Sequence, residues 1–146
     1  MTETAKPAYL DVTQEQGARF FGSARAGEAV MLNLLRFREF ADYSQAPHLA
    51  PESAITGAQA YRRYMEEIEP LLVATGGALL FAGAADHFLI GPSDEKWDFA
   101  MLVRQSSAQA FLGFASDPAA QAATLHRTAA VEDSRLLPLW PEAPLS

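Results

Sequence analysis

Two segments of the sequence carry apolar side chains at both odd and even positions, and this pattern restricts the fold more than any other feature. They are residues 28–37 (EAVMLNLLRF) and residues 96–104 (KWDFAMLVR). A strand with one wet face alternates between apolar and polar residues, whereas a strand covered on both faces does not. A buried helix can also produce the first run, but its position between Gly27 and a polar loop favours a strand. We therefore expect both segments to be central strands of a sheet.

Capping signals place the helices. Thr13, Thr56 and Ser106 each precede a glutamine by three residues, which is the spacing of a capping box, and Asp117 precedes a proline as an N-cap does. Pro70 lies inside the helical period after Thr56 and should kink or restart that helix. The predicted order is a helix at 14–24, a strand at 28–37, a helix from 57 that ends at the glycines 76–77, a strand at 78–91 that bends near 83–86, a strand at 96–104, a helix that starts at 106, a helix at 118–130 and a strand at 133–139.

After the added N-terminal helix this order is β-α-β-β-α-β. With right-handed crossovers it gives an α+β, ferredoxin-like fold, in which an antiparallel sheet with strand order 4-1-3-2 has helices on one face. The two doubly apolar strands are then central. Because the helices cover one face only, an identical chain is the expected cover of the other face, in a homodimer with a barrel-like core.

Composition narrows the class of protein. The chain has 146 residues, which fits a single domain over 1–146 with a core at about 28–139 and a proline-rich C-terminal tail. It has a net charge of −7 and no cysteine, so we expect no nucleic-acid or membrane partner, no disulfide and no cysteine metal site. No segment has the ~20 apolar residues of a membrane span, and we expect a cytoplasmic protein.

Three short segments together resemble the DUF1330 family. They are residues 31–37 (MLNLLRF), the motif Gly57-x-x-x-Tyr61-x-x-Tyr64, and the pair Gly76-Gly77. The resemblance covers roughly residues 28–137 and implies the fold of the dimeric α+β barrel superfamily. DUF1330 has no settled activity. The wider superfamily includes cofactor-independent monooxygenases, muconolactone isomerases and heme-handling enzymes, so the resemblance implies small-molecule chemistry by analogy only.

Two polar residues interrupt the most apolar strand, Asn33 and Arg36. A buried amide or guanidinium without a partner destabilises the fold by roughly several kcal/mol. Each of these two side chains must therefore meet a ligand, a counter-charge or a backbone carbonyl. One interpretation is structural: Asn33 bonds to neighbouring backbone and Arg36 pairs with a carboxylate. Being three apart, their side chains should point to opposite faces of the sheet unless a bulge intervenes.

The helix after residue 57 carries Tyr61 and Tyr64 on its apolar stripe, which is typical of a core. A phenol beside Asn33 can instead orient a carbonyl or enolate substrate. Trp97 either packs or stacks on a flat ligand. The functional hypothesis is a pocket between sheet and helices, lined by these four residues and closed by the long loop at 38–56.

The remaining candidates have a structural and a functional interpretation each. His87, beside an aspartate, is either a solvated bend residue or a base near neutral pH. Asp133 and Arg135 share one face of the last strand and form either an edge-strand ion pair or a carboxylate-binding pair. The isolated histidines, including His48 and His126, show no metal-site spacing.

The sequence leaves open whether the protein is an enzyme. The first hypothesis is that it binds a small carbonyl or phenolic metabolite and performs acid–base or cofactor-independent oxidative chemistry on it, with no cofactor and no metal. The alternative is a non-catalytic ligand-binding or dimeric assembly module. In the first hypothesis the catalytic residues are Asn33, Tyr61 and His87, and the substrate-binding residues are Arg36, Tyr64, Trp97, Asp133 and Arg135.

Overall fold

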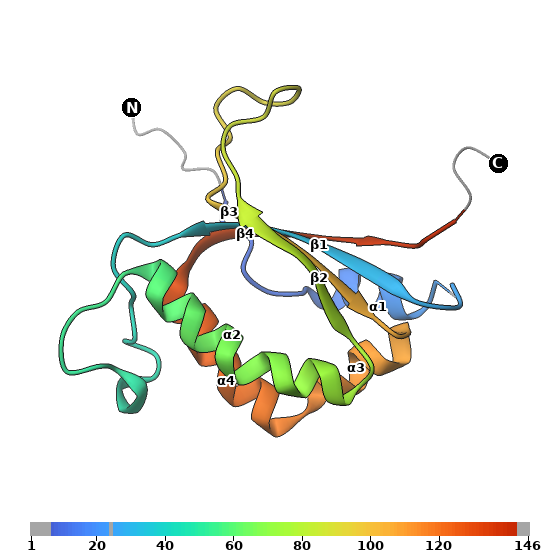
Figure 1. Cartoon of the computed structure of the whole chain (residues 1–146), viewed down its shortest axis with the longest axis horizontal. Coiled ribbons are helices and arrows are strands. Elements are labelled where there is room, and N and C mark those ends of the chain that lie inside the picture. Colours follow the sequence, from blue (N-terminus) through green and yellow to red (C-terminus); the bar gives the residue numbers. More distant parts are fainter. Residues whose placement is uncertain (1–6, 24, 143–146) are drawn as a thin grey trace.

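A computed structural model describes residues 7–23 and 25–142 of the chain. The described part is one sheet with helices packed beneath it (Figure 1). The elements in chain order are α1 (Gln14–Phe21), β1 (Ala29–Phe37), a short 3-10 helix (Pro47–Leu49), α2 (Gly57–Ala74), β2 (Ala78–Ala84), β3 (Phe99–Gln105), α3 (Ala108–Ser116), α4 (Pro118–Ala130) and β4 (Val131–Leu139).

The four strands pair in the order β2-β3-β1-β4, and every neighbouring pair is antiparallel. This confirms the predicted strand order and the central position of the two doubly apolar strands. In the middle of the sheet Leu32 of β1 lies opposite Leu102 of β3 and Leu137 of β4. Since directly paired residues share a face, these three leucines lie on the same side of the sheet.

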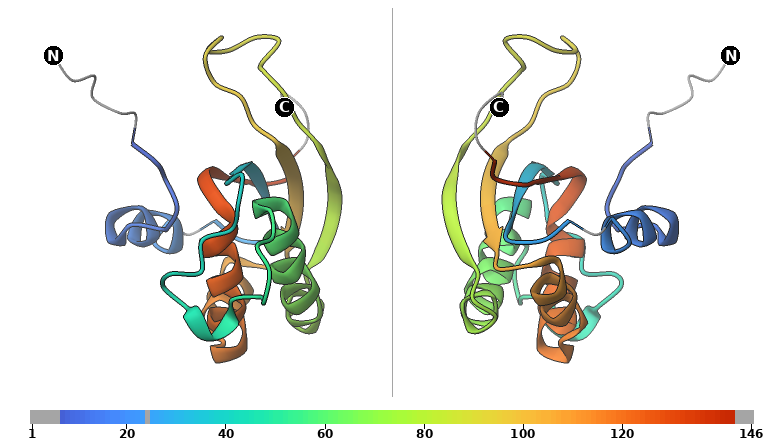
Figure 2. Two further views of the ribbon diagram at one scale, coloured as in Figure 1. Left: turned by 90° about the vertical axis from the view of Figure 1, so that its left-hand side faces the viewer. Right: turned by 90° about the vertical axis from the view of Figure 1, so that its right-hand side faces the viewer.

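The helices α2 and α4 cover one face of the sheet, as Figures 1 and 2 show from three sides. On that face Leu35 and Met101 pack with Tyr61 of α2 and Ala129 of α4 in the main core. The other face carries no helix and is largely apolar; we call it the open face. Its apolar residues, taken from the strand registers, are Val30, Leu32, Leu34, Phe81, Ala100, Leu102, Leu137 and Leu139, and Arg36, Arg104 and Arg135 lie on the same side. The chain therefore has an α+β, ferredoxin-like fold, as predicted.

The caps follow the sequence signals with one shift. Thr56 caps α2 in a full capping box, in which both its side chain and that of Gln59 bond to backbone N–H groups. Asp117 caps α4, as predicted. The cap of α3 is Ser107, not Ser106. The Ser106 hydroxyl donates instead to the carbonyl of Thr75 at 3.0 Å, and this long-range bond overrides the local signal.

Several predicted boundaries differ from the structure. The first helix ends at Phe21 with Gly22 as its cap, and its predicted end at residue 24 lies outside the described residues. Helix α2 runs through Pro70 to Ala74 as one helix, so no new helix starts at this proline; packing against α4 holds a helix that local propensity would interrupt. Gly76 then takes the left-handed conformation, with φ 87°, as its position after the helix requires.

The predicted second strand is the largest difference. β2 ends at Ala84 and β3 begins only at Phe99, so residues 85–98 leave the sheet as a long hairpin, which we call the arm. An isolated bridge between His87 and Lys96 ties its two sides together. The arm projects from the sheet on the side opposite the helices (Figures 1 and 2).

Candidate functional site

The base of the arm brings two arginines onto one tryptophan. Trp97 is only 1% exposed, and the guanidinium carbons of Arg36 and Arg135 lie 5.0 and 4.8 Å from the centre of its ring. Arg36 lies next to the end of β1, Arg135 lies on β4, and both point to the open side of the sheet. Guanidinium groups interact favourably with indole faces at this distance. Three residues far apart in the sequence thus form one compact cluster.

Asp133 organises the charges in this cluster. It is 6% exposed, and its carboxylate accepts hydrogen bonds from Arg135 Nη1, from the backbone N–H of Tyr9 and from that of Ser134, each at 2.8 Å. Burial opposes ionisation of Asp133, but the hydrogen bonds donated by Tyr9, Arg135 and Ser134 outweigh it and hold its pKa below the usual value. Asp133 is therefore a fixed anion that orients Arg135.

Some hydrogen-bonding capacity of the two arginines stays open. Arg36 uses Nε to donate to the carbonyl of Lys96 at 3.1 Å, and its Nη1 lies 3.6 Å from Asp133, beyond hydrogen-bond distance. Arg135 Nη2 lies 3.7 Å from the carboxylate of Glu95. Each of these contacts is an ion pair without a hydrogen bond. An incoming oxygen atom can therefore receive donors from both arginines without breaking the bond between Arg135 and Asp133.

These side chains surround a cavity of about 260 Å³, which we call the arginine pocket. Its volume suits a small metabolite. Three cations and four carboxylates line it, so it is a polar site that a ligand with acceptor oxygens would enter beside existing ion pairs. The lining residues are Ala8, Arg36, Asp94, Glu95, Lys96, Glu132, Asp133 and Arg135.

The structure thus brings together four of the eight residues singled out in the sequence: Arg36, Trp97, Asp133 and Arg135. Asn33 lies on the helix-covered side of β1, opposite to the side of Arg36, as the spacing predicted. Its amide donates to the carbonyl of Met31 at 3.2 Å. This bond agrees with the structural interpretation, in which Asn33 bonds to neighbouring backbone.

Tyr61 and Tyr64 lie in the core on α2. Their ring centres are 5.2 Å apart, and Tyr61 also packs against Phe37 at 5.4 Å. Burial raises the pKa of both phenols. His87 lies on the exposed arm, where its Nδ1 is 2.9 Å from Asp86. Of the three residues expected to be catalytic, Asn33 and Tyr61 therefore lie on the helix-covered side of the sheet, whereas His87 lies apart from them on the arm.

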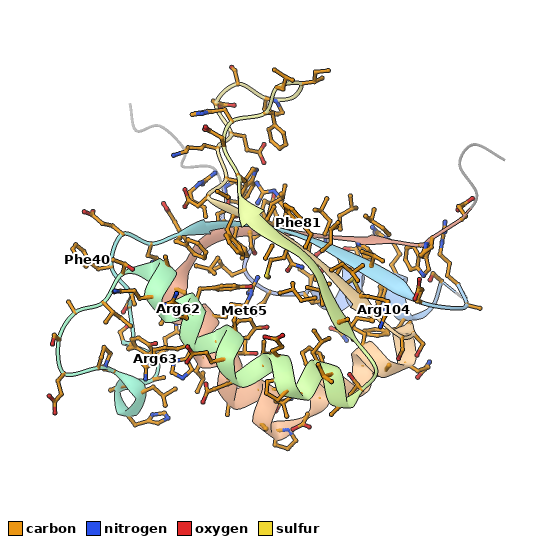
Figure 3. The ribbon with its side chains drawn as sticks, viewed as in Figure 1. Phe40, Arg62, Arg63, Met65, Phe81 and Arg104 are labelled. Atoms are coloured by element: carbon orange, nitrogen blue, oxygen red, sulfur yellow. The ribbon has the colours of Figure 1, made fainter. Side chains whose placement is uncertain are left out.

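A chain of polar side chains that the sequence did not reveal crosses the far side of the helices. Arg63 of α2 donates to the hydroxyl of Tyr43 at 3.0 Å, and that oxygen lies 2.8 Å from Nδ1 of His126 on α4. Nε2 of His126 is 2.9 Å from the carboxylate of Glu67. Figure 3 shows Arg63 on the side of α2 that faces the loop containing Tyr43.

The hydrogen-bond donors in this series of polar side chains define the tautomer of His126. Because the Tyr43 oxygen accepts from Arg63, its own proton is free to be donated to Nδ1 of His126, and Nε2–H then donates to Glu67. His126 is 3% exposed, and its burial lowers its pKa although Glu67 acts in the opposite sense. The neutral histidine therefore holds the loop at 38–56 against the helices.

A faint signal for His126 existed in the sequence. It follows Ala123 by three residues and precedes Ala130 by four, which places it on the buried stripe of its helix. Tyr43 lies in a segment without a period, so nothing in the sequence marked it. A second, more open hollow of about 480 Å³ lies beside this chain, between α2, α4 and the 3-10 helix.

Metal and membrane sites are not indicated in the described ranges, 7–23 and 25–142. They contain no group of three or more histidine, aspartate or glutamate side chains arranged to hold a metal ion. Every helix in these ranges is too short or too polar to cross a bilayer.

Comparison with known proteins gives a relative over nearly the whole chain. The structure of methylated RPA0582 matches with 37% identity and a TM-score of 0.84, over 95% of this chain and 98% of that one. A second structure, of RPA0582 as a protein of unknown function from Rhodopseudomonas palustris, matches with 38% identity and a TM-score of 0.83, over 94% and 100%. The chain belongs to the RPA0582 family.

The RPA0582 structures thus share the fold described here over nearly their full length, and one of them is described as a protein of unknown function. Neither a scan against family models nor a search of curated proteins produced a match.

Proposed function

We propose that the protein is a homodimer that binds a small carbonyl or phenolic metabolite in the arginine pocket, through an oxygen atom of the ligand. The observation that carries this proposal is the pair of guanidinium groups held over the buried ring of Trp97. Each has a nitrogen that makes only a long ion pair. A carboxylate, phenolate or polarised carbonyl oxygen is the complementary acceptor.

The rigidity of the pocket supports binding. Asp133 fixes Arg135 by a 2.8 Å bond, and the carbonyl of Lys96 fixes Arg36. Side chains that are already ordered lose little conformational entropy when a ligand arrives, so more of the interaction energy appears as affinity. The proposal does not need either arginine to change its position.

The open face supports the homodimer. It presents eight apolar residues in a continuous patch across all four strands, and three of them exceed a third exposed: Phe81, Leu137 and Leu139. Patches of this kind on a soluble protein mark an interaction surface. In a two-fold dimer the open face of one chain packs against the same face of the second copy. Two sheets packed face to face in this way lie about 10 Å apart.

The proposal extends to acid–base or oxidative turnover of the ligand. The positions of the candidate catalytic residues support turnover less than the arginine pocket supports binding. Asn33 and Tyr61 lie beneath the sheet, and His87 lies on the arm. A reaction needs its acid and base within hydrogen-bond reach of one substrate. A non-catalytic ligand-binding or assembly module is accordingly the second candidate, and the separation of these residues favours it.

We also infer that the RPA0582 family lies within DUF1330. The supporting residues occupy defined places: residues 31–37 form the central strand β1, Tyr61 and Tyr64 lie on α2, and Gly76 terminates that helix with a positive φ. A solved DUF1330 member whose corresponding segments fall in other elements would contradict this assignment.

Calorimetric titration tests the ligand proposal. The probes are 4-hydroxybenzoate and pyruvate, with 4-hydroxybenzamide as a neutral analogue. We expect saturable binding of an acid probe by the native chain. Arg36→Met should weaken it at least about 10-fold, because a hydrogen bond to a charged group contributes about 1.5–3 kcal/mol.

Arg104→Met is the matched control. Arg104 lies on the same side of the sheet but pairs with Glu28 at 3.9 Å, outside the pocket (Figure 3). Its substitution should leave affinity unchanged. Equal affinity of the two variants, or no binding of either acid by the native chain, would show that the arginine pocket is not the site.

A further inference from the structure

The tip of the arm is strongly apolar and lies in solvent. Leu89 is 100% exposed and Ile90 is 93% exposed, with Phe88 beside them at 38%. Single exposed apolar residues are common on protein surfaces, but three in succession at the end of a projecting hairpin are not explained by chance placement. Nothing else in the described part of the chain covers this tip.

The arm is held firmly at its base. The N–H of Ala85 donates to Asp98 at 3.0 Å and the N–H of Trp97 to Asp86 at 3.3 Å. The Asp98 backbone N–H in turn donates to Leu35 of β1 at 2.8 Å. Together with the buried ring of Trp97, these bonds fix the direction in which the arm leaves the sheet. The arm therefore presents its tip at a defined place beyond the open face.

Figures 1 and 2 show the arm on the side of the sheet that carries no helices. Any molecule seated on the open face lies on this same side, next to the arm. In a two-fold dimer formed through the open face, each chain supplies one arm, which projects on the side where its partner lies. The open face and the arm tip are then covered by one and the same partner.

We infer that the arm is a clasp, whose residues Phe88, Leu89 and Ile90 pack against a second copy of this chain in the homodimer. This inference rests on the homodimer proposed above and adds to it a second contact region, separate from the open face. The arm also carries Glu95 and Lys96, which line the arginine pocket, at its base. The clasp therefore joins the dimer contact to the pocket through one continuous segment.

Sedimentation over a concentration series tests the clasp. The three proteins are the native chain, the double variant Leu89→Ser/Ile90→Ser, and Leu137→Lys on the open face. We expect the native chain to be dimeric. The double variant should raise the dimer dissociation constant at least about 100-fold, because two aliphatic side chains lose their burial in each arm. Leu137→Lys should dissociate the dimer by placing a charge in the other contact region.

The outcomes separate the clasp from the dimer. Weakening by both variants supports the clasp. Dissociation by Leu137→Lys, with an unchanged dissociation constant for the double variant, overturns the clasp and leaves the dimer standing. A native chain that is monomeric at every concentration overturns both.

A reporter thiol gives an independent measurement if the double variant fails to fold. The chain has no cysteine, so Leu89→Cys introduces a single one at the tip. We expect its reaction with a thiol reagent to be at least about 10-fold slower in the dimer than after dilution to monomer, since packing excludes the reagent. Ala122→Cys, exposed on α4, is the control and should react equally in both states. Equal rates for Leu89→Cys as well would overturn the clasp.

Discussion

Removal of one hydroxyl, in Tyr43→Phe, should loosen the loop at 38–56 from the helices. This hydroxyl joins the loop to both main helices, because it accepts from Arg63 of α2 and donates to Nδ1 of His126 on α4. Tyr43 is 7% exposed and His126 is 3% exposed, so water cannot readily replace the missing oxygen. The substitution keeps the ring and its packing and removes only the hydrogen-bonding atom.

The expected cost follows from the groups left behind. Nδ1 of His126 becomes a buried acceptor without a donor, and such a group costs about 1–3 kcal/mol. Arg63 is nearer to solvent and recovers most of its hydration. We therefore expect the free energy of unfolding to fall by about 1–3 kcal/mol, which corresponds to a fall in Tm of roughly 3–15 °C for a chain of this length.

Urea unfolding followed by circular dichroism measures this change. The midpoint should fall while the slope with denaturant stays constant. Tyr9→Phe is the control, because the Tyr9 side chain is 53% exposed, and it should change stability by less than about 0.5 kcal/mol. A double-mutant cycle with His126→Phe should give a coupling of at least about 0.5 kcal/mol. If the free energy of unfolding of Tyr43→Phe falls by less than about 0.5 kcal/mol, Tyr43 does not anchor the loop.

Two further predictions concern stability. Burial lowers the pKa of His126 below its ordinary value of 6.5, so the unfolded chain binds this proton more tightly than the folded one. Its contribution to stability should be complete above about pH 6.5 and should be lost as pH falls from there toward the folded pKa, with a slope of at most ~1.4 kcal/mol per pH unit. His126→Gln should remove that slope from the urea midpoints between pH 5 and 8, roughly, and an unchanged slope would contradict the assignment. Gly57→Ala should lower stability by about 1–3 kcal/mol, because a Cβ there would overlap the carbonyl of Arg38 and lie 2.7 Å from that of Ala130. Gly113→Ala, where a Cβ meets open space in the middle of α3, should stabilise the fold by up to ~1 kcal/mol, and similar effects of the two substitutions in a thermal melt would contradict the steric argument.

The strand order was predictable because it rests on local patterns. Apolar residues at both odd and even positions mark β1 and β3 as strands, and these two strands lie in the centre of the sheet. The capping box at Thr56 and the Asp117-Pro118 pair are equally local, since the side chain and the N–H it bonds are three or fewer residues apart. Such signals do not depend on where the rest of the chain lies.

The arm was missed because its sequence resembles a strand. Phe88, Leu89 and Ile90 are good strand residues, and pairing decides whether such residues join a sheet. β3 begins at Phe99, so no neighbouring strand extends far enough to pair with them. The shift of the α3 cap from Ser106 to Ser107 has the same origin, because a bond to Thr75, 31 residues away, occupies the expected cap.

The sequence by itself determined the fold class and singled out eight candidate site residues, among them Arg36, Trp97, Asp133 and Arg135. Only the tertiary structure decided that these four meet and that Asn33 and Tyr61 do not join them. The physical reason is that a residue's chemistry and its period along the chain are local properties. The register of β1 against β4 sets Arg36 opposite Asp133, and the path of the arm brings Trp97 beneath both arginines. Both depend on contacts between residues about 40 to 100 positions apart.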